Sequence, residues 1–373
     1  MSTSRRVVIV GGGPAGLSAA IELRRLGIAE VVVHEREQVA GGIPRHTDHL
    51  GYGLIDLRRV MTGPRYARRL AASALDAGVV VQTDSPVFDL DGLDADAVVL
   101  ATGVRERPRA ARLVPGDRPA GVFTTGTVQQ LTTLQHLPVG RRAVIVGAEH
   151  VSFSAILALR HGGCRAVAMV TPLPRHQTYA PLRLITAGRH RVPIRTGVDV
   201  VEILGRSRVE AVVLSDGSHI DCDTVVFTGD WIADNELARR SGLTLNAARS
   251  PIVDLSLRTE RNGVFAAGNL VHPAETAGVC ALDGRRVAAT VRAFLDGAKW
   301  PAAVGAIRCE PLLLWATPAA GGITVRSATF ATGRLVARDA AGDVVHRSRP
   351  RRLVPNRAIH LPAVDAAVIA VEG

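Results

Sequence analysis

The chain has 373 residues, of which 47% are hydrophobic and 21% are charged, so it is long enough for two or three globular domains. No window approaches the about 18 uninterrupted apolar residues of a membrane span, and the N-terminus lacks a signal-peptide pattern, so we expect a cytoplasmic protein. The net charge is +11, but the arginines are scattered and aromatic residues make up 3% of the chain. This composition offers no evident base-stacking surface for nucleic acid.

The cysteines lie far apart and form no CxxC pair. We therefore expect buried structural thiols, and we predict neither a redox disulfide nor a cysteine-bound metal or cluster. The four residues are Cys164, Cys222, Cys280 and Cys309.

The first segment with a chemical signature is GGGPAG, which follows the apolar run Val7–Val10 and precedes an expected helix over 15–26. Gly11 permits a tight turn from strand to helix, Gly13 lets the backbone approach a pyrophosphate, and Gly16 lets the helix pack closely on the strand. The helix amides and dipole then bind the diphosphate. This pattern predicts a dinucleotide-binding site.

A second apolar run, Val31–Val33, ends at Glu35, about 20 residues after the glycines, where a carboxylate can bind ribose hydroxyls. Strand, glycines, helix, strand and acid in this order make the prediction specific, whereas GxGxxG alone would be weak.

The order of elements then repeats. Residues 79–90 and 93–103 are expected to form further strands, residues 142–170 repeat the strand–turn–helix–strand order, and IDCDTVVFTGD (220–230) echoes LDADAVVLATG (93–103). We therefore predict an α/β fold with two Rossmann-like domains, the second inserted in the first. The expected boundaries are 1–120 with 246–300 for the first dinucleotide-binding domain, 121–245 for the second, NAD(P)-binding-like domain, and 301–373 for a small β-rich appendage.

The second glycine turn is altered, because Gly147, Glu149 and Ser152 stand where three glycines are expected. A glutamate at the middle position brings bulk and negative charge toward a pyrophosphate, and two like charges about 4 Å apart repel by about 1 kcal/mol in water. The strand that follows ends without an acid, although Arg175 or His176 is suited to a 2′-phosphate and would favour NADPH. The alternatives are a bound NAD(P)H and a vestigial unit kept for packing or for shaping the substrate cleft.

Residues 263–288, GVFAAGNLVHPAETAGVCALDGRRVA, resemble the second flavin signature of the two-dinucleotide-binding-domain flavoproteins, the pyridine nucleotide–disulfide oxidoreductase-like group. Asn269 stands where that family has an acid. The segments GGIPRHTDHLGYG and GNLVHPAETAGVCALDGR are similar, more closely, to the FAD-containing α-subunits of amino-acid, opine and proline dehydrogenases.

The resemblance implies FAD as the cofactor, with a helix starting near 275–277 directed at the pyrimidine edge of the flavin. Together with the glycine motif it predicts a cofactor site at Gly11, Gly13, Pro14, Ala15, Gly16, Glu35, Arg36, Gly42, Arg45, Val87, Ala101, Thr102, Gly103, Gly268, Asn269, Thr276 and Ala277.

Candidates for proton transfer are His46, His49, His272 and Glu275, because a histidine beside a flavin can take a proton from an amine or alcohol. We expect an FAD-dependent oxidoreductase that transfers hydride between flavin N5 and a small substrate, an amine or amino acid. The alternatives are an NAD(P)H-dependent flavin reductase and a non-catalytic FAD-binding subunit of a larger dehydrogenase. A partner subunit or an electron-acceptor protein is a further expectation, and the basic run RSRPRR (347–352) is suited to an acidic partner.

Overall fold

The computed structural model of the protein describes residues 5–319 and 321–373, and the chain folds into two compact units. The first unit comprises the N-terminal segment to Arg45, Leu50–Val104 and Ile232–Gly373; the second comprises His46–His49 and Arg105–Trp231. The chain passes between the units along β7 (Val104–Glu106) and β16 (Trp231–Ala233). The domain boundaries expected from the sequence stay predictions.

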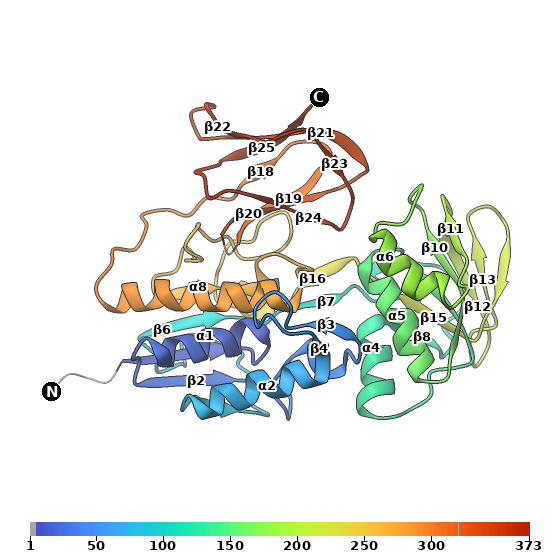
Figure 1. The fold of residues 1–373 in the computed structure, drawn as a ribbon, viewed down its shortest axis with the longest axis horizontal. Helices are drawn as coiled ribbons and strands as arrows, with labels where there is room; N and C mark the ends of the chain where they lie inside the picture. Colours follow the sequence, from blue (N-terminus) through green and yellow to red (C-terminus); the bar gives the residue numbers. More distant parts are fainter. Residues whose placement is uncertain (1–4, 320) are drawn as a thin grey trace. The chain divides into compact units, whose positions relative to one another are not determined.

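The first unit contains a parallel five-stranded sheet in the order β17-β6-β1-β2-β5 (Figure 1). The central strands are buried on both faces, as expected for apolar runs without polar alternation. The strand expected over 79–90 is limited to its first part. Asp84 has a left-handed backbone (φ 49°), and Pro86 has no backbone N–H to donate to a neighbouring strand. The strands are β1 (Arg6–Val10), β2 (Glu30–His34), β5 (Val80–Gln82), β6 (Ala97–Leu100) and β17 (Val264–Ala266).

Two helices from distant parts of the sequence, α1 (Pro14–Arg25) and α8 (Ala277–Leu295), pack side by side in this unit (Figure 1). Their close approach depends on Gly284, because a Cβ there would lie 2.1 Å from the carbonyl oxygen of Ala15. The remaining elements of this part are η1 (Ile43–His46, which ends in the second unit), β3 (Leu50–Tyr52), β4 (Met61–Thr62), α2 (Gly63–Asp76), α7 (Glu236–Arg240) and η4 (Gly268–Leu270).

The second unit repeats this plan with a parallel sheet in the order β11-β10-β9-β15-β8. Its strands are β8 (Val122–Thr124), β9 (Arg142–Val146), β10 (Arg165–Thr171), β11 (Ile194–Thr196) and β15 (Thr224–Phe227). An antiparallel sheet adds β12 (Val200–Leu204), β13 (Ala211–Leu214) and β14 (His219–Asp221). The helical segments are α3 (Arg109–Arg112), α4 (Thr125–Gln129), η2 (Gln130–Leu134), α5 (His150–His161), α6 (Ala180–Arg183) and η3 (Leu184–Gly188).

The C-terminal part of the first unit is β-rich, as expected. Two small sheets, β18-β25-β21-β22 with β23 on β21, and β19-β20-β24, contribute to one apolar core that includes Val325, Leu335 and Ile369. The turn signal DAAGD joins β21 and β22, where the amide of Asp339 donates to the carbonyl of Asp343. The strands are β18 (Arg308–Cys309), β19 (Leu313–Ala319), β20 (Gly322–Ser327), β21 (Ala331–Arg338), β22 (Val344–Arg347), β23 (Arg351–Leu353), β24 (Ala358–Leu361) and β25 (Val368–Glu372).

Over the described part of the chain, residues 5–319 and 321–373, no helix is both long enough and apolar enough to cross a bilayer.

Candidate functional site

The first turn, residues 11–16 between β1 and α1, has the geometry of a dinucleotide cradle. Gly11 has φ +112°, and a Cβ there would lie 2.3 Å from the carbonyl oxygen of Ala101. A Cβ at Gly16 would lie 1.9 Å from the carbonyl oxygen of Gly11, so neither position accepts a side chain. At Gly13, by contrast, the nearest atom to a Cβ is the Cα of Gly42 at 3.9 Å. The turn is therefore tight at its ends and open where a pyrophosphate would approach.

Glu35 lies at the end of β2, beside this turn, and is 7% exposed. Its Oε2 accepts a hydrogen bond from the Gly12 amide at 2.9 Å, and its Oε1 accepts one from the Glu37 amide at 2.9 Å. A buried carboxylate fixed by two amides retains lone pairs that can accept bonds from ribose hydroxyls.

Two further loops border the first turn. Gly42 has φ +62°, and a Cβ there would lie 2.9 Å from the Cα of Gly13. Arg45 forms an ion pair with Glu37. The loop after β6 is fixed by Thr102, whose Oγ1 donates to the Asp234 carbonyl at 2.7 Å.

The remaining expected cofactor residues lie in the same unit. The guanidinium of Arg36 lies 2.8 Å from the Asp234 carboxylate, whose backbone amide donates to the Gly103 carbonyl at 2.9 Å. Val87 is half-buried against the core of this unit.

The segment before α8 completes this region. Gly268 has φ +68°, and a Cβ there would lie 2.6 Å from the Cβ of Ala15, so the segment touches the first turn of α1. Asn269 uses its amide group on its own loop: Nδ2 donates to the Glu275 carbonyl at 3.0 Å, and Oδ1 accepts from the Glu275 amide at 2.8 Å. Thr276 is the N-cap of α8, and the amides of Ala277 and its neighbours lie at the positive end of the helix dipole.

Together the open turn at Gly13, the buried carboxylate of Glu35 and the helix start at Thr276 fit FAD. Each matches one part of the cofactor: pyrophosphate, ribose and the electron-rich edge of the reduced ring.

The loop before α8 is also fixed from the C-terminal sheets by Arg326, a residue that the sequence did not single out. Its Nη2 lies 2.7 Å from Glu275 Oε1 and donates to the Ala274 carbonyl at 2.9 Å. The two side chains of this ion pair are 5% and 6% exposed, and the guanidinium lies 5.6 Å from the Trp315 ring centroid. Nothing local distinguishes Arg326 from the many other arginines, because its partners lie about 50 positions away in the chain.

Of the proton-transfer candidates, the structure brings together His272 and Glu275. His272 is 0% exposed, and its Nε2 is paired with the equally buried carboxylate of Asp283 on α8. Burial opposes the charged imidazolium, but the Asp283 carboxylate outweighs it and raises the pKa of His272 above its ordinary value. His46 and His49 are grouped with the second unit, where the neighbouring Thr47 hydroxyl donates to Gln129 Oε1 at 3.2 Å. Catalytic roles for these four residues stay predictions.

The second turn, residues 147–152 between β9 and α5, has the same tight start. Gly147 has φ +136°, and a Cβ there would lie 2.0 Å from Thr228 Oγ1. Ser152, at the third glycine position, is fully buried and its Oγ lies 2.6 Å from Thr228 Oγ1. Glu149, at the middle position, is the N-cap residue of α5 and is 6% exposed.

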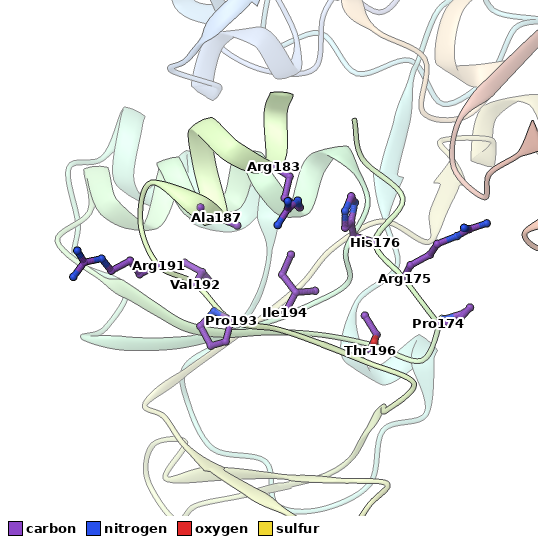
Figure 2. Close-up of a pocket in the computed structure, with 11 residues that line it drawn as sticks. Pro174, Arg175, His176, Arg183, Ala187, Arg191, Val192, Pro193, Ile194 and Thr196 are labelled. Atoms are coloured by element: carbon purple, nitrogen blue, oxygen red, sulfur yellow. The ribbon is translucent and has the colours of Figure 1, made fainter. Parts of the chain in front are cut away.

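The second unit also contains a hollow of about 530 Å³ beyond the end of β10 (Figure 2). Arg183 and His176 both line it, while in the view of Figure 2 Arg175 and Arg191 extend toward its two ends. None of the described residues that line this basic hollow has a carboxylate.

The comparisons with known proteins agree with this geometry. Residues 5–294 match the Pyridine nucleotide-disulphide oxidoreductase family. The chain is 26% identical over 292 residues to the benzene 1,2-dioxygenase system ferredoxin–NAD(+) reductase subunit of Pseudomonas putida, covering 72% of this chain and 67% of that protein. It is 24% identical over 312 residues to an opine oxidase subunit of Agrobacterium tumefaciens (strain Ach5), covering 70% of this chain and 60% of that protein. The crystal structure of T. acidophilum thioredoxin reductase aligns with a TM-score of 0.66 at 21% identity, covering 78% of this chain and 98% of that one. The predicted fold class and the resemblance to two-domain flavoproteins are confirmed.

Proposed function

This chain belongs to the pyridine nucleotide–disulphide oxidoreductase family of FAD-dependent oxidoreductases, and from that premise we propose that it oxidises NADPH and passes the electrons to a separate acceptor protein. The observation that carries the proposal is the basic hollow at the end of β10.

The position of this hollow bears on which nicotinamide cofactor is used. In a βαβ dinucleotide unit, the end of the second strand faces the adenosine ribose: an acid there binds the 2′-hydroxyl of NADH, and a cation there accommodates the 2′-phosphate of NADPH. In the second unit this strand is β10, and Arg175, His176 and Arg183 follow it. We propose that Arg183 and His176, which both line the basic hollow (Figure 2), contact the 2′-phosphate.

The first unit would hold FAD through the first turn, Glu35, the Gly42 loop and the start of α8. When bound, FAD supplies the hydride chemistry of the reaction. The chain's own residues provide orientation: Glu35 fixes the ribose, and the amides at the start of α8 stabilise negative charge at the pyrimidine edge. The Glu275–Arg326 ion pair fixes the loop that carries these amides.

The acceptor is proposed to be an acidic electron-transfer protein. The ferredoxin–NAD(+) reductase relative, by its name, acts in a multi-component dioxygenase system. In this chain Arg351 and Arg352 on β23 and Arg349 just before it are exposed, whereas Arg347 is paired with Glu372. Exposed cations of this kind speed encounters with an acidic partner and make the rate depend on salt.

A second candidate is the oxidation of an amine or amino acid, which the similarity to the opine oxidase protein favours. It would use the same FAD site and would not need the second unit to bind a nucleotide.

Anaerobic reduction of the purified FAD-loaded protein distinguishes the two. We expect NADPH to bleach the flavin faster than NADH, and a panel of amino acids and opines to leave it oxidised. Bleaching by an amino acid but by neither nicotinamide would replace the proposal with the second candidate.

The variant Arg183→Gln should raise the KM for NADPH by about 10- to 100-fold, since a bond to a charged group contributes about 1.5–3 kcal/mol. The exposed Arg189→Gln, outside the hollow, is the matched control.

A further inference from the structure

The two turns share one backbone conformation at their middle position. The N-cap residue of α1, Gly13, has φ −82° and ψ −172°, and the N-cap residue of α5, Glu149, has φ −89° and ψ −179°. Extended torsions of this kind are open to any residue, so the glutamate imposes no strain on the turn. The second turn therefore retains the shape of a pyrophosphate cradle, and the side chain of Glu149 is what differs.

That side chain is folded into the second turn. A Cβ at Gly147 would lie 2.8 Å from Glu149 Oε2, and one at Gly229 would lie 2.7 Å from Glu149 Oε1. The carboxylate thus lies between the first glycine of the turn and the glycine that follows β15. Its Oε1 is buried and has no hydrogen-bond partner among the described residues. A buried acceptor without a donor is costly, and a proton or a ligand donor would satisfy it.

A second buried carboxylate, that of Glu106, interacts electrostatically with Glu149. Glu106 is 7% exposed, and its Oε2 accepts from the Gly126 amide at 2.8 Å. Burial, reinforced by the charge of Glu149, raises the pKa of Glu106 to about 7, although the Gly126 amide and the Thr125 hydroxyl oppose the rise.

Other charged groups surround the pair. Arg112 on α3 acts on both carboxylates and donates from Nη2 to the carbonyls of Thr228 (3.0 Å) and Gly229 (2.8 Å). Arg112 is also near Asp230 and Arg107. The positive charge that Arg112 brings to the two acids is therefore shared with backbone carbonyls.

We propose that Glu149 is the residue that makes dinucleotide binding in the second unit conditional on proton uptake, an inference that rests on the proposed use of NADPH. The pyrophosphate brings two negative charges to a turn that already contains the Glu149 and Glu106 carboxylates. One proton moves from solvent onto this carboxylate pair as the dinucleotide binds, and no covalent bond changes. Above about pH 7 Glu106 loses its proton, so the dinucleotide binds with uptake of one proton and its affinity falls by about tenfold for each further pH unit. Below this pH Glu106 already carries the proton, and the affinity is constant.

Isothermal titration calorimetry of the full-length FAD-loaded protein with NADP⁺ tests this without any turnover. Titrations from pH 6 to 9, in two buffers of different ionisation enthalpy, give both the Kd and the number of protons taken up. For the wild type we expect about one proton taken up at pH 8 and a Kd that rises about tenfold between pH 7.5 and 8.5. Glu149→Gly should bind about 10- to 100-fold more tightly at pH 8, with the proton uptake greatly reduced. Glu149→Gln, which keeps the bulk and removes the charge, should also weaken the pH dependence of the Kd.

The exposed Glu202→Gln on β12 of the same unit is the control and should behave as the wild type. Bound FAD per chain and the far-UV circular dichroism spectrum should be unchanged in every variant, which shows that both units have folded. Equal Kd values and equal proton uptake in wild type and Glu149→Gly would overturn this inference and leave the proposed function standing. Absence of NADP⁺ binding in both, even at pH 6, would overturn the proposed use of NADPH and the inference with it.

Discussion

The first and second turns have the same backbone hydrogen bond but differ in the side chain at their middle position. In each, the first glycine has a left-handed φ, and its amide donates to the strand that follows the helix: Gly11 to the His34 carbonyl and Gly147 to the Val170 carbonyl, both at 2.8 Å. The helix that follows has 12 residues in both units. The difference lies in the residue at the middle position of the turn, which is Gly13 in the first unit and Glu149 in the second. Backbone geometry thus specifies where a diphosphate would bind, and side-chain charge specifies whether it does.

The largest effect is expected when the glutamate at the middle position of the second turn is introduced at the middle position of the first turn. Gly13→Glu should weaken FAD binding by about 1000-fold, because a carboxylate about 4 Å from a phosphate charge costs about 4 kcal/mol near a protein surface. The Cβ has open space, so the apoprotein should fold with an unchanged Tm. Bound flavin per chain and the melting curve measure the two quantities. Full flavin content in Gly13→Glu would contradict the assignment of the first turn to FAD.

The next effect concerns the loop before α8, which the C-terminal sheets support through Arg326. Arg326→Met removes one partner of the buried Glu275 ion pair, and we expect it to lower the free energy of unfolding by about 3–5 kcal/mol. Chemical denaturation followed by flavin release measures it. The exposed Arg351→Met in the same sheets is the control. Equal stability of the two variants would show that the C-terminal sheets do not fix the loop before α8.

A smaller effect is expected from the buried acid beside the second turn. The pKa of Glu106 is raised to about 7 from its ordinary 4.5, so the folded state binds more protons between these values. Stability therefore falls as pH rises from about 4.5 to 7, by about 3 kcal/mol in all, and is constant above. Glu106→Gln should abolish this slope and be more stable than the wild type at pH 8. Unfolding midpoints measured at several pH values in this window test it, and parallel slopes for the two proteins would refute it.

The smallest effect is at the third position of the turns. Ser152→Ala removes the hydroxyl pair with Thr228, and we expect a loss of about 1 kcal/mol, because Thr228 still donates to the Val146 carbonyl. Thermal unfolding measures it. Gly16→Ser, the corresponding exchange in the first turn, should be far more damaging, since a Cβ there would lie 1.9 Å from a carbonyl oxygen. Similar losses for both would mean that the turns do not differ in packing.

The sequence predicted both turns and the acid after the first, because these features depend on residues close together in the chain. Glu35, Gly147 and Glu149 lie where their spacing indicated. Glu106 and Arg326 escaped prediction, because their importance comes from burial and from partners brought together only by the fold. The grouping of His46 and His49 with the second unit also depends on long-range contacts that no local pattern encodes.

The packing of α1 against α8 has a consequence for the growing chain. The first unit needs β17 to complete its sheet and the Gly284 region to cover α1, and both are translated after the whole second unit. During synthesis on the ribosome, the apolar strands and the helix of residues 6–34 therefore stay exposed to solvent. They can be buried only after about 250 more residues have emerged. The second unit has no such delay. We therefore expect nascent chains to acquire a protease-resistant second unit before they can bind flavin.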